Sequence, residues 1–302
     1  MKHKKVILLF GPTASGKSRL AVDLAEKFNG EIINADSMQL YKEVKILSSR
    51  PEDSVIKHHL YGFVSVKKNF SVGLWHKLAI EKIKEVNKKG KISIVVGGTG
   101  LYFKVLMEGL SEIPAVPKLD MNLNLLERHF MINSYARKYP GIFKGIDPND
   151  KQRLYRAISV YEHTGTPLWE WYKKENKKTY FKSEKFIKIF LNPSKSKLET
   201  EIKKRFNKML KNGAIQEVQN FKKLHVKSLN SSNFIIGLKE ISEFLNKEIT
   251  LDKLKEKVLI RTRQYVKRQF TWQRGQMQDW KGFTDINYLN LRKKVLGYLS
   301  KT

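Results

Sequence analysis

The residues best suited to chemistry lie near the N-terminus, where positions 11–18 read Gly-Pro-Thr-Ala-Ser-Gly-Lys-Ser. This is a complete G-x-x-x-x-G-K-[ST] phosphate-binding loop, preceded by an apolar run at 6–10 and followed by a helix-forming stretch at 19–28. In such a loop backbone N–H groups face a phosphate, a lysine adds charge and a serine offers its hydroxyl to a divalent metal. We therefore expect a di- or triphosphate to be bound by Gly11, Pro12, Thr13, Ala14, Ser15, Gly16, Lys17 and Ser18, with Ser18 as the metal ligand. The alternative is a glycine turn that fits the motif by chance.

Two further polar positions follow apolar strands. Asp36 follows the run at 31–35 and is the one acid that closes a predicted core strand, whereas the run at 92–96 ends in Gly97-Gly-Thr-Gly100 without an acid. An aspartate at a strand end is suited to metal binding or to general base catalysis, and the alternative is an N-cap for the next helix. Thr99 is suited to donate a hydrogen bond to phosphate, and the alternative is a plain turn.

An Arg-rich segment near the C-terminus combines basic and aromatic residues. Arg261, Tyr265, Arg268 and Trp272 are spaced by 4, 3 and 4 residues and share one face of a helix. This pattern suits contacts with RNA phosphates and stacking on unpaired bases. The alternative is a solvated face in which the two aromatic side chains are packed into the core.

The composition supports a polyanionic partner. The net charge is +30, and the basic residues comprise 47 Lys and 12 Arg. Lysine enrichment alone is what an AT-rich genome would produce, so the few arginines, grouped at 261–274 and at 153–156, carry more weight. The chain has no cysteine, which excludes disulfides and thiolate metal sites, and no apolar run long enough to span a membrane. These features predict a soluble cytoplasmic protein that binds nucleic acid.

The order of the predicted elements indicates an α/β fold. Strands at 6–10, 31–35 and 92–96 alternate with helices at 19–28 and 73–88, which is typical of a parallel sheet covered on both faces. Helices near 119–138 and 150–164 follow, and a strand at 186–191 precedes helices at 196–211, 213–224, 237–247 and 251–274. We expect a P-loop NTPase-like core at 1–115 and 185–302, an all-helical insertion at 116–184 and a helical C-terminal part. Because ligands bind at the carboxyl ends of parallel strands, the phosphate loop, Asp36 and Gly97–Gly100 should converge.

Several of these stretches together resemble the tRNA dimethylallyltransferase (tRNA isopentenyltransferase) family. The resemblance rests on Gly11–Ser18, Asp36-Ser-Met-Gln-Leu-Tyr41, His58-His-Leu60, Val96–Tyr102, Asn149–Ala157 and Lys267-Arg-Gln-Phe-Thr-Trp272, in the family's order and across nearly the whole chain. Each stretch is weak evidence alone, and together they are specific.

The resemblance implies a reaction and its partners. A dimethylallyl group would pass from dimethylallyl diphosphate to the exocyclic amine of an adenosine beside the tRNA anticodon, with Asp36 as general base and Lys17, Thr99 and Mg²⁺ at Ser18 stabilising the leaving diphosphate. The insertion would grip the anticodon stem-loop, and a monomer is expected. The tRNA-contacting positions that the resemblance implies are Asp36, Ser37, Met38, Gln39, Thr99, Gln152, Arg153, Leu154, Tyr155, Arg156, Lys267, Arg268, Gln269, Thr271, Trp272 and Arg274.

The chain departs from the family pattern at three places: Gly237-Leu-Lys239 lacks an aromatic residue, Met121 stands where an arginine is common, and Leu47-Ser-Ser-Arg-Pro51 replaces a Gly-Thr-Ala-Lys-Pro segment. These departures bear on rate or tRNA choice. The alternative functions are a P-loop nucleoside or small-molecule kinase and a non-catalytic P-loop RNA-binding protein. The lack of an acid after 92–96 argues against the kinase, and Asp36 argues against the binding protein.

Overall fold

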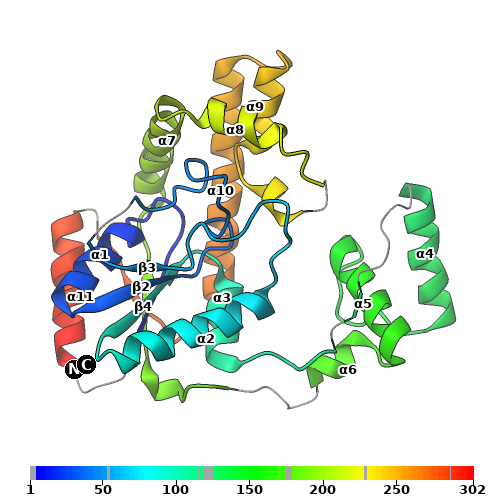
Figure 1. Cartoon of the computed structure of the whole chain (residues 1–302), viewed down its shortest axis with the longest axis horizontal. Coiled ribbons are helices and arrows are strands. Elements are labelled where there is room, and N and C mark those ends of the chain that lie inside the picture. The colour runs from blue at the N-terminus through cyan, green and yellow to red at the C-terminus, as the bar shows by residue number, and fades with distance from the viewer. Residues whose placement is uncertain are drawn as a thin grey trace. The chain divides into compact units, whose positions relative to one another are not determined.

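The computed structural model describes residues 5–52, 55–114, 116–117, 125–173, 179–227, 230–285 and 287–302. The chain forms two compact units (Figure 1). Unit 1 comprises Met1–Met107 and Phe181–Thr302, and unit 2 comprises Glu108–Tyr180. Unit 2 overlaps the helical insertion expected at 116–184, but it begins and ends a few residues earlier. Within the described ranges, no helix is both long and apolar enough to cross a membrane.

Unit 1 is organised around one six-stranded sheet in which neighbouring strands run parallel. The strand order is β3-β2-β4-β1-β5-β6. The four longer strands match the predicted ones to within one residue, whereas β3 and β6 were not expected. The strands are β1 (Val6–Phe10), β2 (Gly30–Asn34), β3 (His58–His59), β4 (Ile92–Gly97), β5 (Phe186–Leu191) and β6 (Lys281–Phe283).

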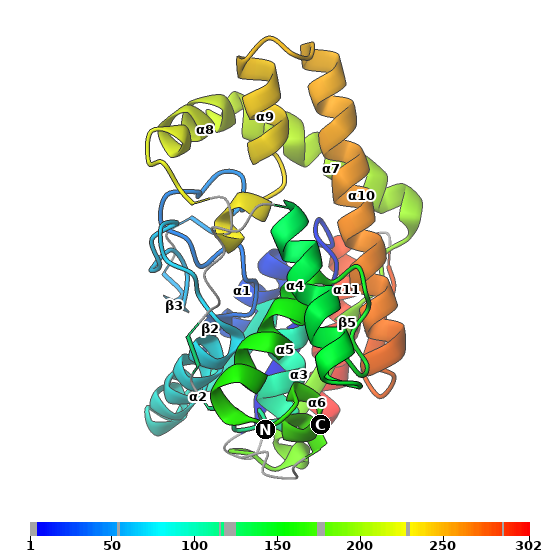
Figure 2. The same cartoon turned by 90° about the vertical axis from the view of Figure 1, so that its right-hand side faces the viewer.

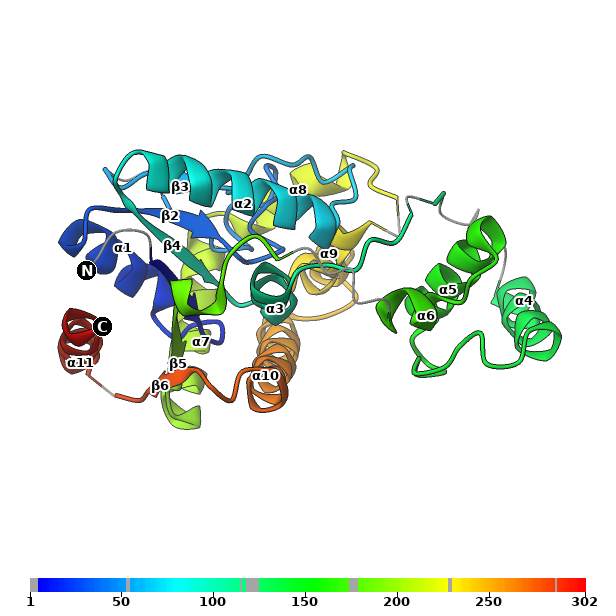
Figure 3. The same ribbon diagram turned by 90° about the horizontal axis from the view of Figure 1, so that it is seen from below.

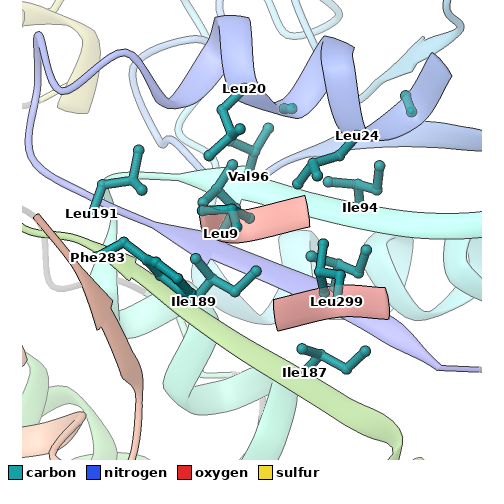
Figure 4. Packing of buried hydrophobic residues seen from close by; sticks show 14 of the residues in the cluster. Leu9, Leu20, Leu24, Ile94, Val96, Ile187, Ile189, Leu191, Phe283 and Leu299 are labelled. Carbon is teal, nitrogen blue, oxygen red and sulfur yellow. The ribbon is translucent and has the colours of Figure 1, made fainter. Parts of the chain in front are cut away.

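Helices cover both faces of this sheet, as the continuous apolar strands predicted. On one face, α1 (Lys17–Lys27) and α11 (Tyr288–Lys301) pack on Leu9 and Ile189 (Figure 4). On the other face lie α2 (Val72–Lys88) and α3 (Gly100–Glu108), where Phe103 meets Phe10 edge to face with ring centroids 5.6 Å apart. The sheet is therefore rigidly held between two layers, which fixes the positions of the loops at its ends.

Between β5 and β6, unit 1 is helical (Figure 2). The long helix α10 packs against α7 through Val266, Leu198 and Ile202. The observed bounds lie within two residues of the predicted ones, apart from α11, which was not predicted. The helices are α7 (Lys195–Lys211), α8 (Ala214–Lys222), α9 (Leu238–Leu245) and α10 (Leu251–Gln276), with short 3₁₀ turns η1 (Ser183–Lys185) and η2 (Ser231–Phe234).

Unit 2 is helical, with α4 (Leu125–Lys138), α5 (Lys151–Thr164) and α6 (Leu168–Lys173). The Asp150 carboxylate caps α5 by accepting a hydrogen bond from the Arg153 N–H at 3.1 Å, and Gly165 ends it in a left-handed conformation. A small apolar core forms around Val160 and Leu168. The observed bounds of α5 thus agree with the helix predicted near 150–164. The predicted start of α4, near residue 119, lies outside the described residues.

Candidate functional site

Three loops meet at the carboxyl ends of neighbouring strands, as the α/β pattern predicted. The phosphate loop follows β1, the segment around Asp36 follows β2, and Gly97–Gly100 lies at the end of β4. In the sheet, β4 is between β1 and β2, and Figure 3 shows it beside β2. Backbone hydrogen bonds join the loops: the Gly11 N–H donates to the Gly97 carbonyl at 3.4 Å and the Thr99 N–H to the Ala35 carbonyl at 3.2 Å. The three motifs therefore form one site.

The phosphate loop has the curled backbone that its sequence requires. Gly16 has φ +83°, a left-handed conformation that costs glycine little, and it directly precedes α1. Ala14 adopts φ +61°. The Lys17 ammonium folds back and donates to the Pro12 carbonyl at 3.1 Å. The positive end of α1 and the lysine are thereby placed where a phosphate would bind.

A second cation, which the sequence analysis missed, lies beside the loop. Arg205 of α7 donates from Nη1 to the Thr13 hydroxyl at 2.7 Å, and burial lowers the pKa of its guanidinium. Burial also lowers the pKa of Lys17 to about 8; the Asp36 carboxylate opposes this shift and the positive charge of Arg205 adds to it. Two partly desolvated cations that repel each other form a site for an anion. The available signal was an isolated arginine in a lysine-rich helix.

The Asp36 side chain is held in place by its own loop. Its Oδ1 accepts a hydrogen bond from the Met38 N–H at 3.0 Å, and its backbone N–H donates to the Asn34 side chain at 2.8 Å. Oδ2 lies on the side of Gly98. One carboxylate oxygen thus fixes the loop while the carboxylate borders an open cavity, which is a suitable arrangement for a base.

Thr99 takes part in a polar network at the same place. Its hydroxyl oxygen accepts from the Ser37 N–H at 3.0 Å and lies 3.2 Å from the Ser37 hydroxyl, to which it donates. The Tyr265 side chain of α10 hydrogen-bonds to Thr99, and burial next to the Asp36 carboxylate raises the pKa of the Tyr265 phenol. Tyr265 therefore stays protonated at neutral pH. This network ties α10 to the loops after β2 and β4.

A cavity of about 410 Å³ opens beside these groups. Thr13, Asp36 and Arg205 form its polar end. Apolar side chains of α7, of the segments around 47 and 235 and, at Val258, of α10 form an apolar wall, whereas the other lining residues of α10 are polar or charged. The predicted residues Ser37, Met38 and Arg268 also line it, whereas Lys17 and Thr99 are not part of the lining. The apolar wall comprises Leu47, Ile202, Phe206, Met209, Ile235 and Val258.

The basic–aromatic face of α10 is divided between two tasks. Arg261, Tyr265 and Arg268 line the cavity, and the Arg261 guanidinium also forms a 2.6 Å ion pair with Glu240. Trp272 instead packs directly over Gly100, where any added Cβ would overlap the indole. Trp272 Nε1 is completely covered. The packing alternative thus describes Trp272, while Arg268 stays exposed as the RNA-contact interpretation requires.

Four other positions assigned to tRNA have side chains engaged within the protein. Gln269 is buried and bonds to the loops of the site, and the Gln39 amide donates to the carbonyls of Ser48 and Ser49 at 3.0 Å each. Leu154 and Tyr155 are buried in unit 2. These side chains are not available for RNA, because core packing and internal hydrogen bonds use them. In contrast, the side chains of Gln152, Arg153, Lys267, Thr271 and Arg274 are exposed, and that of Arg156 is half-buried.

The departures from the family pattern fall at different places. Leu47 and Ser48 line the cavity, so the altered segment at 47–51 forms part of its wall. Leu238 is buried at the start of α9, so no aromatic residue reaches the cavity from this position. Met121 lies outside the described residues.

The Lys17 pKa predicts how anion binding depends on pH. Lys17 is charged below pH 8, and above it the free protein must take up a proton to pair with an anion. We expect pyrophosphate affinity, measured by titration calorimetry, to fall by up to about tenfold per pH unit above pH 8. The Lys17→Met variant should bind more weakly and lack this fall. The ionisation of pyrophosphate affects both proteins equally. The same pH dependence of affinity in Lys17→Met and in the unaltered protein would therefore contradict a role for Lys17.

The chain is similar to known proteins along nearly its whole length. A family model described as IPP transferase matches residues 39–276. The tRNA dimethylallyltransferase of Pelagibacter ubique is 46% identical, covering 99% of this chain and 96% of its own. The tRNA dimethylallyltransferase of Parvibaculum lavamentivorans is 38% identical, and the match covers 98% of this chain and 96% of that protein.

Two solved structures agree in fold. The full-length tRNA isopentenylpyrophosphate transferase of Bacillus halodurans has a TM-score of 0.69 at 26% identity, covering 99% of this chain and 96% of its own. A eukaryotic dimethylallyltransferase acting on tRNA has a TM-score of 0.76 at 27% identity, covering 93% and 74%. Because the family model matches residues 39–276 and the relatives align along nearly the whole chain, this chain belongs to the IPP transferase family.

Proposed function

We propose that this protein transfers a dimethylallyl group from dimethylallyl diphosphate to the exocyclic amine of an adenosine adjacent to the anticodon of tRNA. The observation that carries the proposal is the shared cavity, in which the Asp36 carboxylate and the anion site at Thr13 and Arg205 face the same space. The base and the diphosphate site must border the same space, because the displacement takes place at a carbon atom between them. The match to tRNA-modifying relatives along nearly the whole chain supports the same reaction.

The polar end of the cavity suits the diphosphate. The loop N–H groups, Lys17 and Arg205 supply donors and positive charge, and both cations gain a counter-ion when the anion binds. The apolar wall suits the five-carbon chain, which makes no hydrogen bonds and gains free energy from leaving water. A nucleoside triphosphate would instead place polar groups against that wall.

The transfer is a displacement at the first carbon of the dimethylallyl group. The adenosine N6 forms a bond to this carbon while the bond from the carbon to the diphosphate oxygen breaks. Asp36 accepts the N6 proton, and the diphosphate leaves with the electron pair of the broken bond, held by Lys17 and Arg205. Thr99, bonded to Ser37 and Tyr265, keeps the loop beside Asp36 in place.

Magnesium fits the residues at the phosphate loop. Ser18 is exposed at the start of α1, next to Lys17, and Mg²⁺ prefers oxygen ligands shared between one or two protein groups and substrate phosphates. Among the described residues, no group of three or more His, Asp or Glu side chains could hold a metal by itself. Ser18 would therefore hold the ion together with the diphosphate, whose negative charge the ion would neutralise.

The RNA would reach the cavity along α10. Arg268 is exposed and lines the cavity, and its guanidinium carbon lies 5.7 Å from the Tyr265 ring centroid. An adenosine in an anticodon loop leaves its stack at low cost, so its base can meet Asp36. In unit 2, the exposed side chains of Gln152 and Arg153 on α5 are offered as further contacts. A cytoplasmic location and a monomeric state stay predictions.

Labelled substrates test the reaction class. Bulk tRNA is incubated with the protein and either dimethylallyl diphosphate labelled in its carbon chain or ATP labelled in its γ-phosphate. We expect the carbon label in tRNA, with release of pyrophosphate, and no phosphate label. Incorporation of phosphate, or tRNA-stimulated ATP hydrolysis without prenylation, would reveal a kinase or ATPase instead.

The Asp36→Asn variant tests the general base. Asparagine keeps an oxygen that accepts the Met38 N–H but cannot take the N6 proton, so the single-turnover rate should fall by about 10²–10⁴-fold while tRNA affinity stays the same. Asp252→Asn, at a 96% exposed carboxylate on α10, is the matched control and should leave the rate unchanged. A near-normal rate in Asp36→Asn would remove Asp36 from this role.

Salt dependence tests the RNA contact of Arg268. Each Lys or Arg that neutralises an RNA phosphate adds roughly 0.7–0.9 to the slope of log affinity against log salt. We expect Arg268→Ala to weaken tRNA binding and to flatten this slope by about one. Arg263→Ala is the control, because Arg263 lies on the same helix but pairs with Glu199 at 3.1 Å. Equal slopes in Arg268→Ala and the unaltered protein, with the fold intact, would show that Arg268 makes no phosphate contact.

A further inference from the structure

Gln269 of α10 is a buried amide whose two ends bond to two different loops of the site. Its side-chain oxygen accepts a hydrogen bond from the Thr13 N–H at 3.0 Å, and its nitrogen donates to the Gly98 carbonyl at 2.9 Å. The residue is 4% exposed. Because Thr13 N–H only donates and the Gly98 carbonyl only accepts, the two partners determine the orientation of the amide.

The chain is shaped to admit this amide. A Cβ added at Gly98 would overlap the Gln269 nitrogen, whereas its other two nearest neighbours, the Asp36 Oδ2 and the Gly11 carbonyl, would lie at an ordinary 3.5 Å. Gly98 has no positive φ that would require glycine. The missing side chain at Gly98 thus makes room for Gln269, in the place where the carboxylate of the proposed base also lies.

Thr13 is held from two helices. Gln269 of α10 binds its backbone N–H, and Arg205 of α7 binds its hydroxyl. The two helices pack against each other through Val266 and Ile202. The first half of the phosphate loop is therefore fixed to the C-terminal helices, not only to β1 and α1 that precede and follow it.

We propose that Gln269 is a positioning residue that sets the phosphate loop against the loop carrying Gly98, and thereby sets the diphosphate site relative to Asp36. The proposal rests on the proposed function for its consequence in catalysis, but its effect on anion binding stands independently. An amide is required because one planar group must both accept and donate. A side chain without it leaves the half-buried Thr13 N–H and the buried Gly98 carbonyl without this partner.

Three variants test the proposal: Gln269→Ala, Gly98→Ala and the double variant. Gln269→Ala removes the amide. Gly98→Ala keeps the amide but places a methyl group where its nitrogen lies, and so displaces it. In the double variant the new methyl group occupies space that the amide has left. Each protein is measured for pyrophosphate affinity by calorimetry, for tRNA affinity and for thermal unfolding. Gln216 is an exposed glutamine on α8, so Gln216→Ala is the control for replacing a glutamine with alanine.

We expect each single variant to weaken pyrophosphate binding by about tenfold or more, with tRNA affinity within about twofold of the unaltered protein. The double variant should bind no more weakly than Gln269→Ala, because both changes remove the same contact. Unaltered pyrophosphate affinity in Gln269→Ala, or additive losses in the double variant, would overturn the proposal. A proportional loss of both affinities together with the melting temperature would show a structural role only. If Gln269→Ala does not fold, Gly98→Ala decides by the same criteria.

Single-turnover prenylation of the same proteins separates this proposal from the proposed function. If the unaltered protein binds pyrophosphate but transfers no label to tRNA, the proposed reaction is wrong and the pyrophosphate data still decide the role of Gln269. If the unaltered protein transfers the label and Gln269→Ala does so at the same rate with saturating dimethylallyl diphosphate, Gln269 does not position the site for catalysis.

Discussion

The parallel register of β2, β4 and β1 is the constraint on which the site depends. Phe10 pairs with Gly97, and Asn34 pairs with Val96, so the three strands end at the same level. Their next residues begin the phosphate loop, the Asp36 segment and the Gly97–Gly100 loop. A shift of one strand by two residues would move its loop by about 7 Å, farther than any hydrogen bond between these loops can reach. The backbone hydrogen bonds from Gly11 to Gly97 and from Thr99 to Ala35 hold the strand ends at this level.

The charges of the site are unbalanced in a way that favours an anionic ligand. Lys17 and Arg205 are both partly desolvated, and the Asp36 carboxylate raises the pKa of each against the effect of burial. Protonation of Lys17 is therefore costly in the free protein and becomes favourable once a diphosphate arrives. Burial next to the same carboxylate raises the pKa of the Tyr265 phenol, so this group stays protonated at neutral pH. Substrate charge thus completes an arrangement that the protein holds at a cost.

Local sequence patterns predicted what depends on local physics. The loop glycines and the apolar strands indicated the elements and the convergence of their ends. The strand β3 was missed because its two residues are histidines. Of these, His59 is buried, and its Nε2 lies 2.7 Å from a carboxylate oxygen of Glu31. Arg205 and the internal role of Gln269 were missed because both depend on how α7 and α10 pack onto a loop about 190 and 256 residues earlier. No spacing along the chain encodes such a contact.

The position of unit 2 within the chain has a consequence for biosynthesis. β1 pairs with β4 on one side and with β5 on the other, and Val6 meets Phe186, which is 180 positions later. At about 5–20 residues per second, the ribosome releases β5 roughly 9–36 s after β1. During this interval all of unit 2 is made, and the apolar strand β1 has an open edge to which another nascent chain can add. The insertion therefore prolongs the time for which the central strand of the core is exposed to misassembly.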